Sequence, residues 1–200
     1  MSGWESVREF TLGNVERPAT RSRNRIEWGP NAIRVASGST DDRVLTPYAY
    51  VGADRSLYLD DALTQLLCRV VERSEHTWSV LDADGTEVGT ITRIPSGRPL
   101  IRPNWRIAQP GRPELVGRTE WLSGPPGRLA AKAASRLLVG VLDGLTGIGD
   151  EGGDQPTMNR TLEWRAAEEL AMYSEGTTLV TIKADWLDRR LAFAYCLIGK

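Results

Sequence analysis

The chain has 200 residues, enough for one large domain that buries a hydrophobic core without disulfides or metal ions to support it. Its 25 basic and 26 acidic residues nearly cancel, so no whole-chain field favours nucleic acid, which we do not expect as a partner. Of the basic residues, 22 are Arg and only 3 are Lys, a bias that we interpret as the codon usage of a GC-rich bacterial genome.

The two cysteines, Cys68 and Cys196, lie far apart and form neither a CxxC motif nor a disulfide framework, which is typical of a reducing compartment. Charged residues interrupt the first ten positions, so these do not resemble a signal peptide. No apolar stretch reaches the ~18 residues that a membrane span requires. We therefore expect a cytoplasmic protein, with peripheral association at the inner membrane face if its surface binds lipid.

Residues 1–60 are turn-rich, and we expect an irregular N-terminal extension. Within it, RPATRSRNR (17–25) has four Arg and no acid, which is typical of an exposed basic arm; a solvated loop and a phosphate-binding arm are both compatible with it. Residues 31–37 and 47–51 favour short strands. Residues 58–72 stay ambiguous, because Asp60 and Asp61 would cap a helix whereas the β-branched pair near the end would open a strand.

The segment HTWSVLDADGTEVGTITRIP (76–95) alternates as a β-hairpin does. Trp78 and Val80 fall on one face, and Asp84-Gly85 is a turn pair in which Gly supplies a positive φ. A second copy follows at 104–119: WSVLDADGTEVGTI aligns with WRIAQPGRPELVGRT, each with Trp, a β-branched residue, a turn and Val-Gly. Repeated hairpins predict an antiparallel barrel or sandwich.

Residues 127–145, GRLAAKAASRLLVGVLDGL, change to a period of 3.6 and predict an amphipathic helix entered through Pro125-Pro126. Its apolar stripe would pack on the barrel, on a partner or on a membrane; the stripe lacks aromatic anchors, which favours protein packing. The candidate partner-binding residues are Leu137, Leu138, Val141, Leu142 and Leu145.

The final part returns to short strands, RTLEWRA, ELAMYSE and TTLVTIKA, before the tail ADWLDRRLAFAYCLIGK (184–200). A helix from Asp185 to Gly199 would measure ~22 Å, shorter than the ~30 Å hydrocarbon core of a bilayer. Asp185 is a plausible N-cap, with Asp188 in the first turn. From Leu191 onward the helix is apolar on every side, so we expect it to be buried inside the sheet.

The chain offers no catalytic constellation. Its one histidine, His76, has no metal-binding or triad partner nearby, and neither a GxSxG nor a P-loop motif occurs. GIGDEG at 147–152 follows a predicted helix and carries two acids, so it does not fit a pyrophosphate loop. DADG at 82–85 lacks the spacing of a calcium loop. We expect no metal, no cofactor and no enzymatic activity, although an unrecognised hydrolase stays open.

One surface hypothesis comes from an Arg-rich stretch between residues 93 and 118, which holds six Arg against the single acid Glu114. Arg guanidinium groups beside aromatic rings are suited to bind an anionic headgroup or a phosphate. The alternative is a solvated barrel face with Trp in the core. The candidate residues for an anionic headgroup are Arg93, Arg98, Arg102, Arg106, Arg118 and Trp105.

Taken together, the W-x-[VI]…G…VG hairpins, the strands ending TTLVTIKA and the apolar tail WLDRRLAFAYCLIGK resemble the Tubby C-terminal-like superfamily, which includes LURP-one-related and phospholipid-scramblase-like proteins. The resemblance covers about residues 62–200. It implies a closed barrel of about twelve strands around a C-terminal hydrophobic helix, lipid or phosphoinositide binding, and no catalytic residues. The acidic calcium segment of scramblases is not matched, because TTLVTIKAD offers only Asp185.

These observations predict a mainly β (α+β) protein: a closed antiparallel barrel over residues 61–200 around a C-terminal helix, with one amphipathic helix inserted at 127–145. The expected function is non-enzymatic binding of an anionic phospholipid or headgroup at the Arg-rich surface. The alternative is a scaffold or accessory protein that docks a protein partner, or a second copy of itself, through the inserted helix.

Overall fold

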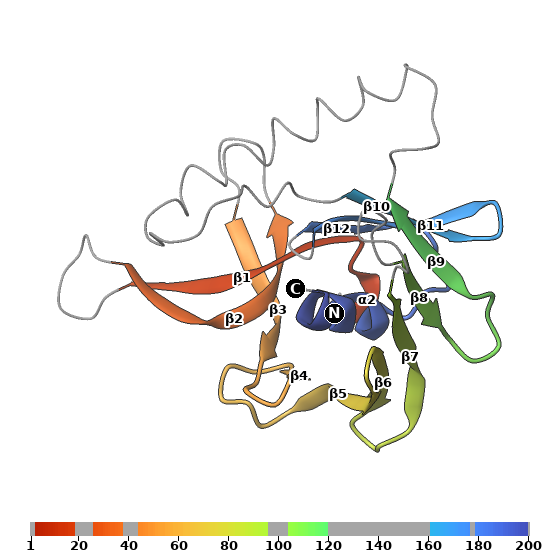
Figure 1. The fold of residues 1–200 in the computed structure, drawn as a ribbon. Coiled ribbons are helices and arrows are strands. Elements are labelled where there is room, and N and C mark those ends of the chain that lie inside the picture. The colour runs from red at the N-terminus through yellow and green to blue at the C-terminus, as the bar shows by residue number, and fades with distance from the viewer. Residues whose placement is uncertain are drawn as a thin grey trace, which may run out of the picture.

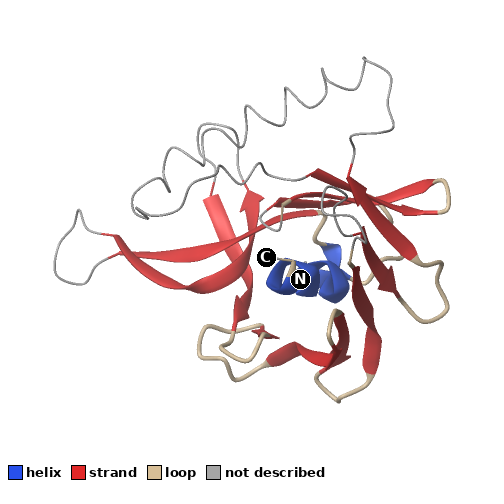
Figure 2. Ribbon diagram, viewed as in Figure 1, coloured by secondary structure: helices blue, strands red, loops and turns tan. Residues whose placement is uncertain are grey.

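A computed structural model describes residues 3–18, 26–37, 44–95, 104–119, 161–176 and 179–199 of the chain. In these residues, antiparallel strands form one closed barrel in which each strand pairs with its neighbours in sequence and β1 closes the ring against β12. A helix lies in the middle of the ring (Figures 1 and 2). The predicted fold, a mainly β protein built as a closed antiparallel barrel around a C-terminal helix, is confirmed.

The elements follow one another in this order: η1 (Trp4–Ser6), β1 (Glu9–Pro18), β2 (Ile26–Ser37), β3 (Val44–Val51), β4 (Ser56–Tyr58), β5 (Leu66–Ser74), β6 (Thr77–Asp82), β7 (Glu87–Ile94), β8 (Asn104–Ala108), β9 (Leu115–Thr119), β10 (Thr161–Ala166), β11 (Glu169–Glu175), β12 (Leu179–Ile182) and α2 (Arg189–Ile198). The predicted inserted helix at 127–145 lies outside the described residues, as does most of the basic arm.

The prediction that residues 1–60 form an irregular extension is wrong. This segment supplies β1 to β4, a third of the ring, and β1 is the strand that closes it. The alternation of side chains is hidden because the register shifts at bulges, for example between Asn14 and Glu16 and between Ile33 and Arg34. Pro30 and Pro47 also lie within strands, where Pro is uncommon.

The ambiguity at residues 58–72 is resolved in favour of strands β4 and β5, joined by a loop. The Asp60 carboxylate does act as a cap, but of this loop: it accepts hydrogen bonds from the backbone N–H groups of Thr64 (3.0 Å) and Gln65 (2.7 Å). These two bonds and the one from the Thr64 hydroxyl lower the pKa of Asp60. The side chain therefore fixes a turn rather than a helix.

The two hairpins predicted from the repeat are β6–β7 and β8–β9. Their turns contain Gly85 and Gly111, with φ of 83° and 70°, a conformation that few other residues adopt without strain. Both tryptophans of the repeat, Trp78 and Trp105, face the barrel interior.

The Val-Gly pair of each copy has a packing role. Gly89 and Gly117 both lie at inward-facing positions. A Cβ on Gly89 would clash first with the Ala108 carbonyl oxygen of β8 and would lie 3.1 Å from the Leu191 side chain, and one on Gly117 would lie 2.9 Å from the Trp164 ring. The glycines of the repeat therefore allow close approach of the neighbouring strand at Gly89 and of a large ring at Gly117.

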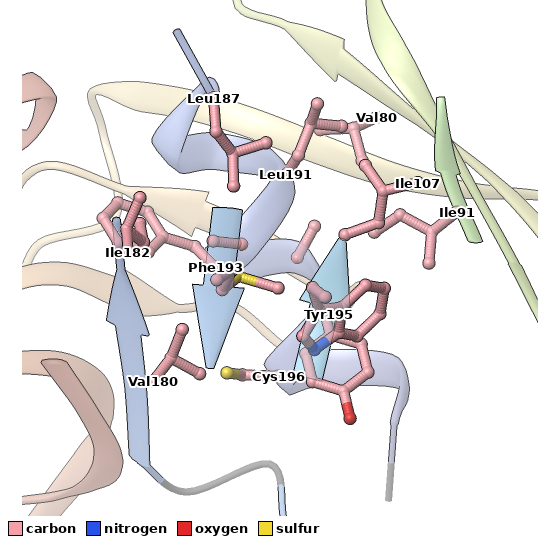
Figure 3. Packing of buried hydrophobic residues seen from close by; sticks show 14 of the residues in the cluster. Val80, Ile91, Ile107, Val180, Ile182, Leu187, Leu191, Phe193, Tyr195 and Cys196 are labelled. Carbon is pink, nitrogen blue, oxygen red and sulfur yellow. The ribbon is translucent and has the colours of Figure 1, made fainter. Parts of the chain in front are cut away.

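The tail forms the core of the barrel. Residues 191 to 196 of α2 are all buried, with exposed fractions of 0 to 2%, and they contact inward-facing side chains around the ring (Figure 3). Phe193 packs edge-on against Phe10 of β1, with ring centroids 4.8 Å apart. Helix and barrel therefore share one hydrophobic core.

The start of this helix differs from the prediction. It begins at Arg189, and its N-cap is Asp188, whose carboxylate accepts a hydrogen bond from the Arg190 N–H at 2.9 Å. Asp185, the predicted N-cap, lies in the preceding turn and forms an ion pair with Arg8. The turn is held in place by Gln109, which donates to the Trp186 carbonyl and accepts from the Asp188 N–H.

No helix in the described part of the chain is long and apolar enough to cross a membrane.

Candidate anionic-ligand site

The barrel has two ends, which the register of the strands defines. The entry end is where α2 begins, beside Gln109 at the end of β8. The helix then passes Gly89, which faces Leu191, and reaches Trp105, whose ring contacts Tyr195. The exit end is therefore where β7 ends and β8 begins.

The structure describes four of the six predicted headgroup residues: Arg93 on β7, Arg106 and Trp105 on β8, and Arg118 on β9. Arg98 and Arg102 lie outside the described residues, as do all five predicted partner-binding residues of the 127–145 segment. The four described residues lie on three adjacent strands, so the sheet does bring this part of the sequence together.

The four residues do not share one face of the sheet. Trp105 is directly opposite Arg93 in the β7–β8 register and opposite Gly117 in the β8–β9 register, and this row continues the interior row of Ile91 and Ile107. Arg93 therefore belongs to the interior face, at the exit end, where its side chain is exposed. Its guanidinium carbon lies 6.0 Å from the centroid of the Trp105 ring, in cation–π contact.

Arg106 and Arg118 point to the outside of the barrel, and each has a carboxylate for a neighbour. The Arg106 guanidinium lies 3.4 Å from the Glu114 carboxylate. Arg118 is exposed and pairs in register with Glu163, whose carboxylate forms an ion pair with Arg165 at 3.2 Å. Of the two outer arginines, Arg106 is thus partly neutralised by Glu114, whereas Arg93 forms its contact with an aromatic ring.

The alternation of residues along each strand indicates that Arg93 and Arg106 lie on different faces of the sheet. Arg93 has the same parity as Ile91, and Arg106 has the opposite parity to Trp105 and Ile107. The prediction grouped the arginines by closeness in sequence, and that closeness does not distinguish the two faces of a strand.

An aromatic group surrounds Trp105 in the interior. Its ring stacks with that of Trp78 at a centroid distance of 6.0 Å and an interplanar angle of 28°, and it meets Tyr195 edge-on at 5.4 Å. Trp164 also meets Tyr195 edge-on, at 4.7 Å. These contacts join the tryptophans of β6, β8 and β10 to the last turns of α2.

The indole N–H groups of Trp164 and Trp78 differ in their partners. Trp164 donates to the Ser174 hydroxyl at 3.0 Å. Trp78 is also buried, and its Nε1 has no hydrogen-bond acceptor within the described structure. A buried donor without an acceptor costs about 1–3 kcal/mol, so the Trp78 indole N–H lowers the stability of the core as long as it stays unpaired.

The entry end is closed by the N-terminal segment. Arg189, 5% exposed, donates from Nε to the Val7 carbonyl at 3.0 Å and from Nη1 to the carbonyls of Ala184, Asp185 and Leu187. Burial lowers the pKa of Arg189. The next residue, Arg190, lies over the Trp4 ring at 5.1 Å and bonds the Asp188 carboxylate through Nε and Nη2. Sequence reasoning missed this closure, because η1 falls in the segment assigned to an extension.

The described residues contain no group of three or more His, Cys, Asp or Glu placed to hold a metal ion. Cys68 and Cys196 are both free and buried. Burial raises the pKa of the Cys68 thiol to about 12, so it is a poor nucleophile near neutral pH. What the described interior offers a ligand is one exposed guanidinium, one indole donor and an aromatic surface, all at the exit end.

Comparisons with known protein families, with curated proteins and with solved structures find no match for this chain.

Proposed function

We propose that the protein is a non-enzymatic binding protein that holds an anionic phospholipid headgroup at the arginines of β7, β8 and β9, at the inner face of the membrane. The observation that carries the proposal is the exposed guanidinium of Arg93 above the Trp105 ring at the exit end. Arg binds phosphate with two parallel hydrogen bonds, and Trp is suited to positions where one side is apolar and the other is wet.

The outward-facing Arg106 and Arg118 add positive charge around this position, at about 1 kcal/mol per basic residue near an anionic surface. Glu114 reduces that contribution at Arg106. The expected binding is therefore weak, and it depends strongly on ionic strength because exposed charges are screened within about 10 Å at 0.1 M salt.

The architecture supports the superfamily resemblance as part of the proposal. A closed antiparallel barrel around a buried C-terminal helix is the fold that the Tubby C-terminal-like resemblance implies. We infer on this ground that the chain is a distant member of that superfamily. Calcium-dependent scrambling is not part of the proposal, since the corresponding acidic segment is not matched.

Liposome flotation tests the proposal. The protein is expected to float with phosphatidylglycerol vesicles at low salt, to be released as salt is raised, and not to float with phosphatidylcholine alone. Charge reversal at Arg93 and Arg106 together (R93E/R106E) should abolish flotation. R69E is the matched control, because Arg69 is an exposed arginine on β5 outside the cluster. If the wild-type protein does not float at low salt, the proposal fails.

Docking of a protein partner through residues 127–145 is the alternative function, and it is supported by the amphipathic pattern of that segment. Deleting residues 128–145 should release a co-purifying partner while the barrel stays folded. If deletion leaves the composition of the purified sample unchanged, this alternative is wrong.

A further inference from the structure

We propose that the exit end of the barrel contains a binding site for an anionic amphiphile: its phosphate pairs with Arg93, a headgroup oxygen accepts the hydrogen bond of the Trp78 indole, and the apolar chain begins on the small part of the Trp105 ring that Arg93, Trp78 and Tyr195 leave exposed. This inference rests on the proposed function and names the position and chemistry of the site. It places the specific contact with the ligand at the exit end of the barrel interior, rather than on the outer face of the strands.

The first support is the Trp78 indole itself. Trp78 is 9% exposed, and its Nε1 lacks an acceptor within the described structure. Trp164 lies in the same core and has its N–H bonded to Ser174. Since buried donors are almost always paired, an unpaired one marks a position where an acceptor is expected to bind, here once the side chains that cover Nε1 move aside.

The second support is that the backbone holds Arg93 next to this indole. The Arg93 N–H donates to the His76 carbonyl at 2.8 Å, which fixes the end of β7 against the turn that opens β6. Trp78 follows two residues later and pairs in register with Ile91, which has the same parity as Arg93. The guanidinium and the indole therefore belong to the same face and the same end of the barrel.

The third support is a gradient of burial along this face. Ile91 and Val80 are 0% exposed, Trp105 and Trp78 are 7% and 9% exposed, and Arg93 is exposed. Both tryptophan rings are thus mostly buried, and Arg93 lies over the Trp105 ring on the solvent side. A ligand that arrives from solvent meets the charge first and the rings next.

The chemistry of these groups selects the class of ligand. A cation is disfavoured, because Arg93 already occupies the face of the Trp105 ring that a quaternary ammonium group would use. An uncharged hydrocarbon would leave both the guanidinium and the indole donor unpaired. Inorganic phosphate would satisfy the donors but would leave the ring surface uncovered. A phosphate that carries an acyl chain uses all three groups.

Nuclear magnetic resonance of the indole N–H groups tests the site in the intact protein. The probe is short-chain phosphatidylglycerol below its micelle concentration, and the Trp78 resonance is identified by its loss in W78F. We expect this resonance to move downfield on titration and to saturate, as it gains an acceptor. Short-chain phosphatidylcholine and inorganic phosphate should each bind at least ~10-fold more weakly, because the choline cation is repelled by Arg93 and inorganic phosphate has no acyl chain.

Two substitutions should each weaken binding of the probe about 10-fold: W78F, which keeps an aromatic ring but removes the donor, and R93Q, which removes the charge. The matched controls are W164F, whose donor is already bonded to Ser174, and R69Q, at an exposed arginine of β5 outside the site. Both controls should bind as the wild type does, with thermal melting as the check that each variant is folded.

The outcomes separate this site from the general lipid function. If vesicle flotation persists unchanged in W78F and R93Q but falls in R106Q/R118Q, the headgroup lies on the outer face, which overturns the inference and leaves the proposed function standing. If the probe shifts the Trp78 resonance but vesicles are not bound, the site stands with a free amphiphile as its ligand, and the membrane function fails. If no probe moves the Trp78 resonance, or if inorganic phosphate binds as tightly as the lipid, the inference is overturned.

Discussion

Two buried polar side chains show how differently the ends of the barrel are built. At the entry end, the Arg189 guanidinium is surrounded by backbone carbonyls of the turn before α2 and of Val7. The dipoles of these neutral carbonyl groups offset the cost of burying the charge. The hydrogen bonds therefore hold the tail against the N-terminal segment. At the exit end, the Trp78 donor has no such compensation. The two ends thus differ in whether their buried polar groups are compensated.

Cys68 gives a prediction at the scale of one residue. Its thiol is fully buried on β5, and burial raises its pKa from 9.0 to about 12. In the unfolded chain the thiol ionises near 9.0, whereas in the folded protein it stays neutral until about 12. The free energy of unfolding should therefore hold up to about pH 9 and then fall by up to ~1.4 kcal/mol per pH unit from this group as pH rises toward 12.

Urea denaturation across that pH range measures the effect, and C68A is the control that isolates it from other titrating groups. The variant should be less stable at neutral pH, because it leaves a cavity, but its stability should decline less steeply above pH 9. Equal slopes for the two proteins would show that the thiol is accessible to water in the folded state.

At the scale of elements, the structure explains why a helix can occupy the barrel interior at all. Gly89 on β7 lies against Leu191, and Gly117 on β9 lies against Trp164. The strands have glycine, which has no side chain, where Leu191 and the Trp164 ring need space, and residues 191 to 196 of the helix are all buried. At these positions the sequence of the sheet is complementary to the side chains in the interior.

The start of α2 gives the second prediction. D188A removes the N-cap bond to the Arg190 N–H and both side-chain bonds to the Arg190 guanidinium, and it should lower the free energy of unfolding by about 1–2 kcal/mol. D185A removes only an ion pair to Arg8 from a carboxylate that is 83% exposed, and it should cost less than about 1 kcal/mol. Urea unfolding of the two variants compares them directly. A larger loss for D185A would mean that the helix starts earlier.

The elements that sequence predicted are those with regular patterns. The two hairpins have alternating side chains and Gly at the turn, and the tail is apolar on every side of a helix, so each could be recognised locally. Of β1 to β4, only the parts at 31–37 and 47–51 were predicted as strands. The rest was missed, because bulges and the prolines at 30 and 47 interrupt the alternation and β1 pairs with a distant part of the chain. The N-cap of α2 was missed by three residues, because Gln109, which holds the preceding turn, is remote in sequence.

The same distinction applies to the candidate site. Sequence identified Trp105 and three arginines on adjacent strands, but the separation of Arg93 from Arg106 follows from strand parity and register. The stacking of Trp78 on Trp105 and the unpaired indole N–H depend on side-chain packing across β7, for which the sequence has no local signal.

At the scale of the whole molecule, the ring is closed by its two chain ends. β1 pairs with β12, and the Val7 carbonyl, just before β1, binds Arg189, the first residue of α2. Closure of the barrel and insertion of the helix therefore both require contact between the first and last parts of the chain. Contacts this distant in sequence form at a high entropic cost, which indicates a single cooperative folding unit rather than a barrel with an appended tail.

This arrangement makes the last prediction. A chain of residues 61–200 lacks β1 to β4, so β5 and β12 become open edges and the core loses Phe10, Ile33 and Leu57. Because open edges aggregate and the helix loses part of its surrounding wall, this chain should be insoluble or show no cooperative thermal transition. Residues 1–60 supplied as a separate chain should restore a cooperative transition, since the cut falls in the exposed loop between β4 and β5 and every strand pairing is retained. A soluble 61–200 chain that melts cooperatively on its own would instead show that the first four strands are dispensable and that the barrel closes without them.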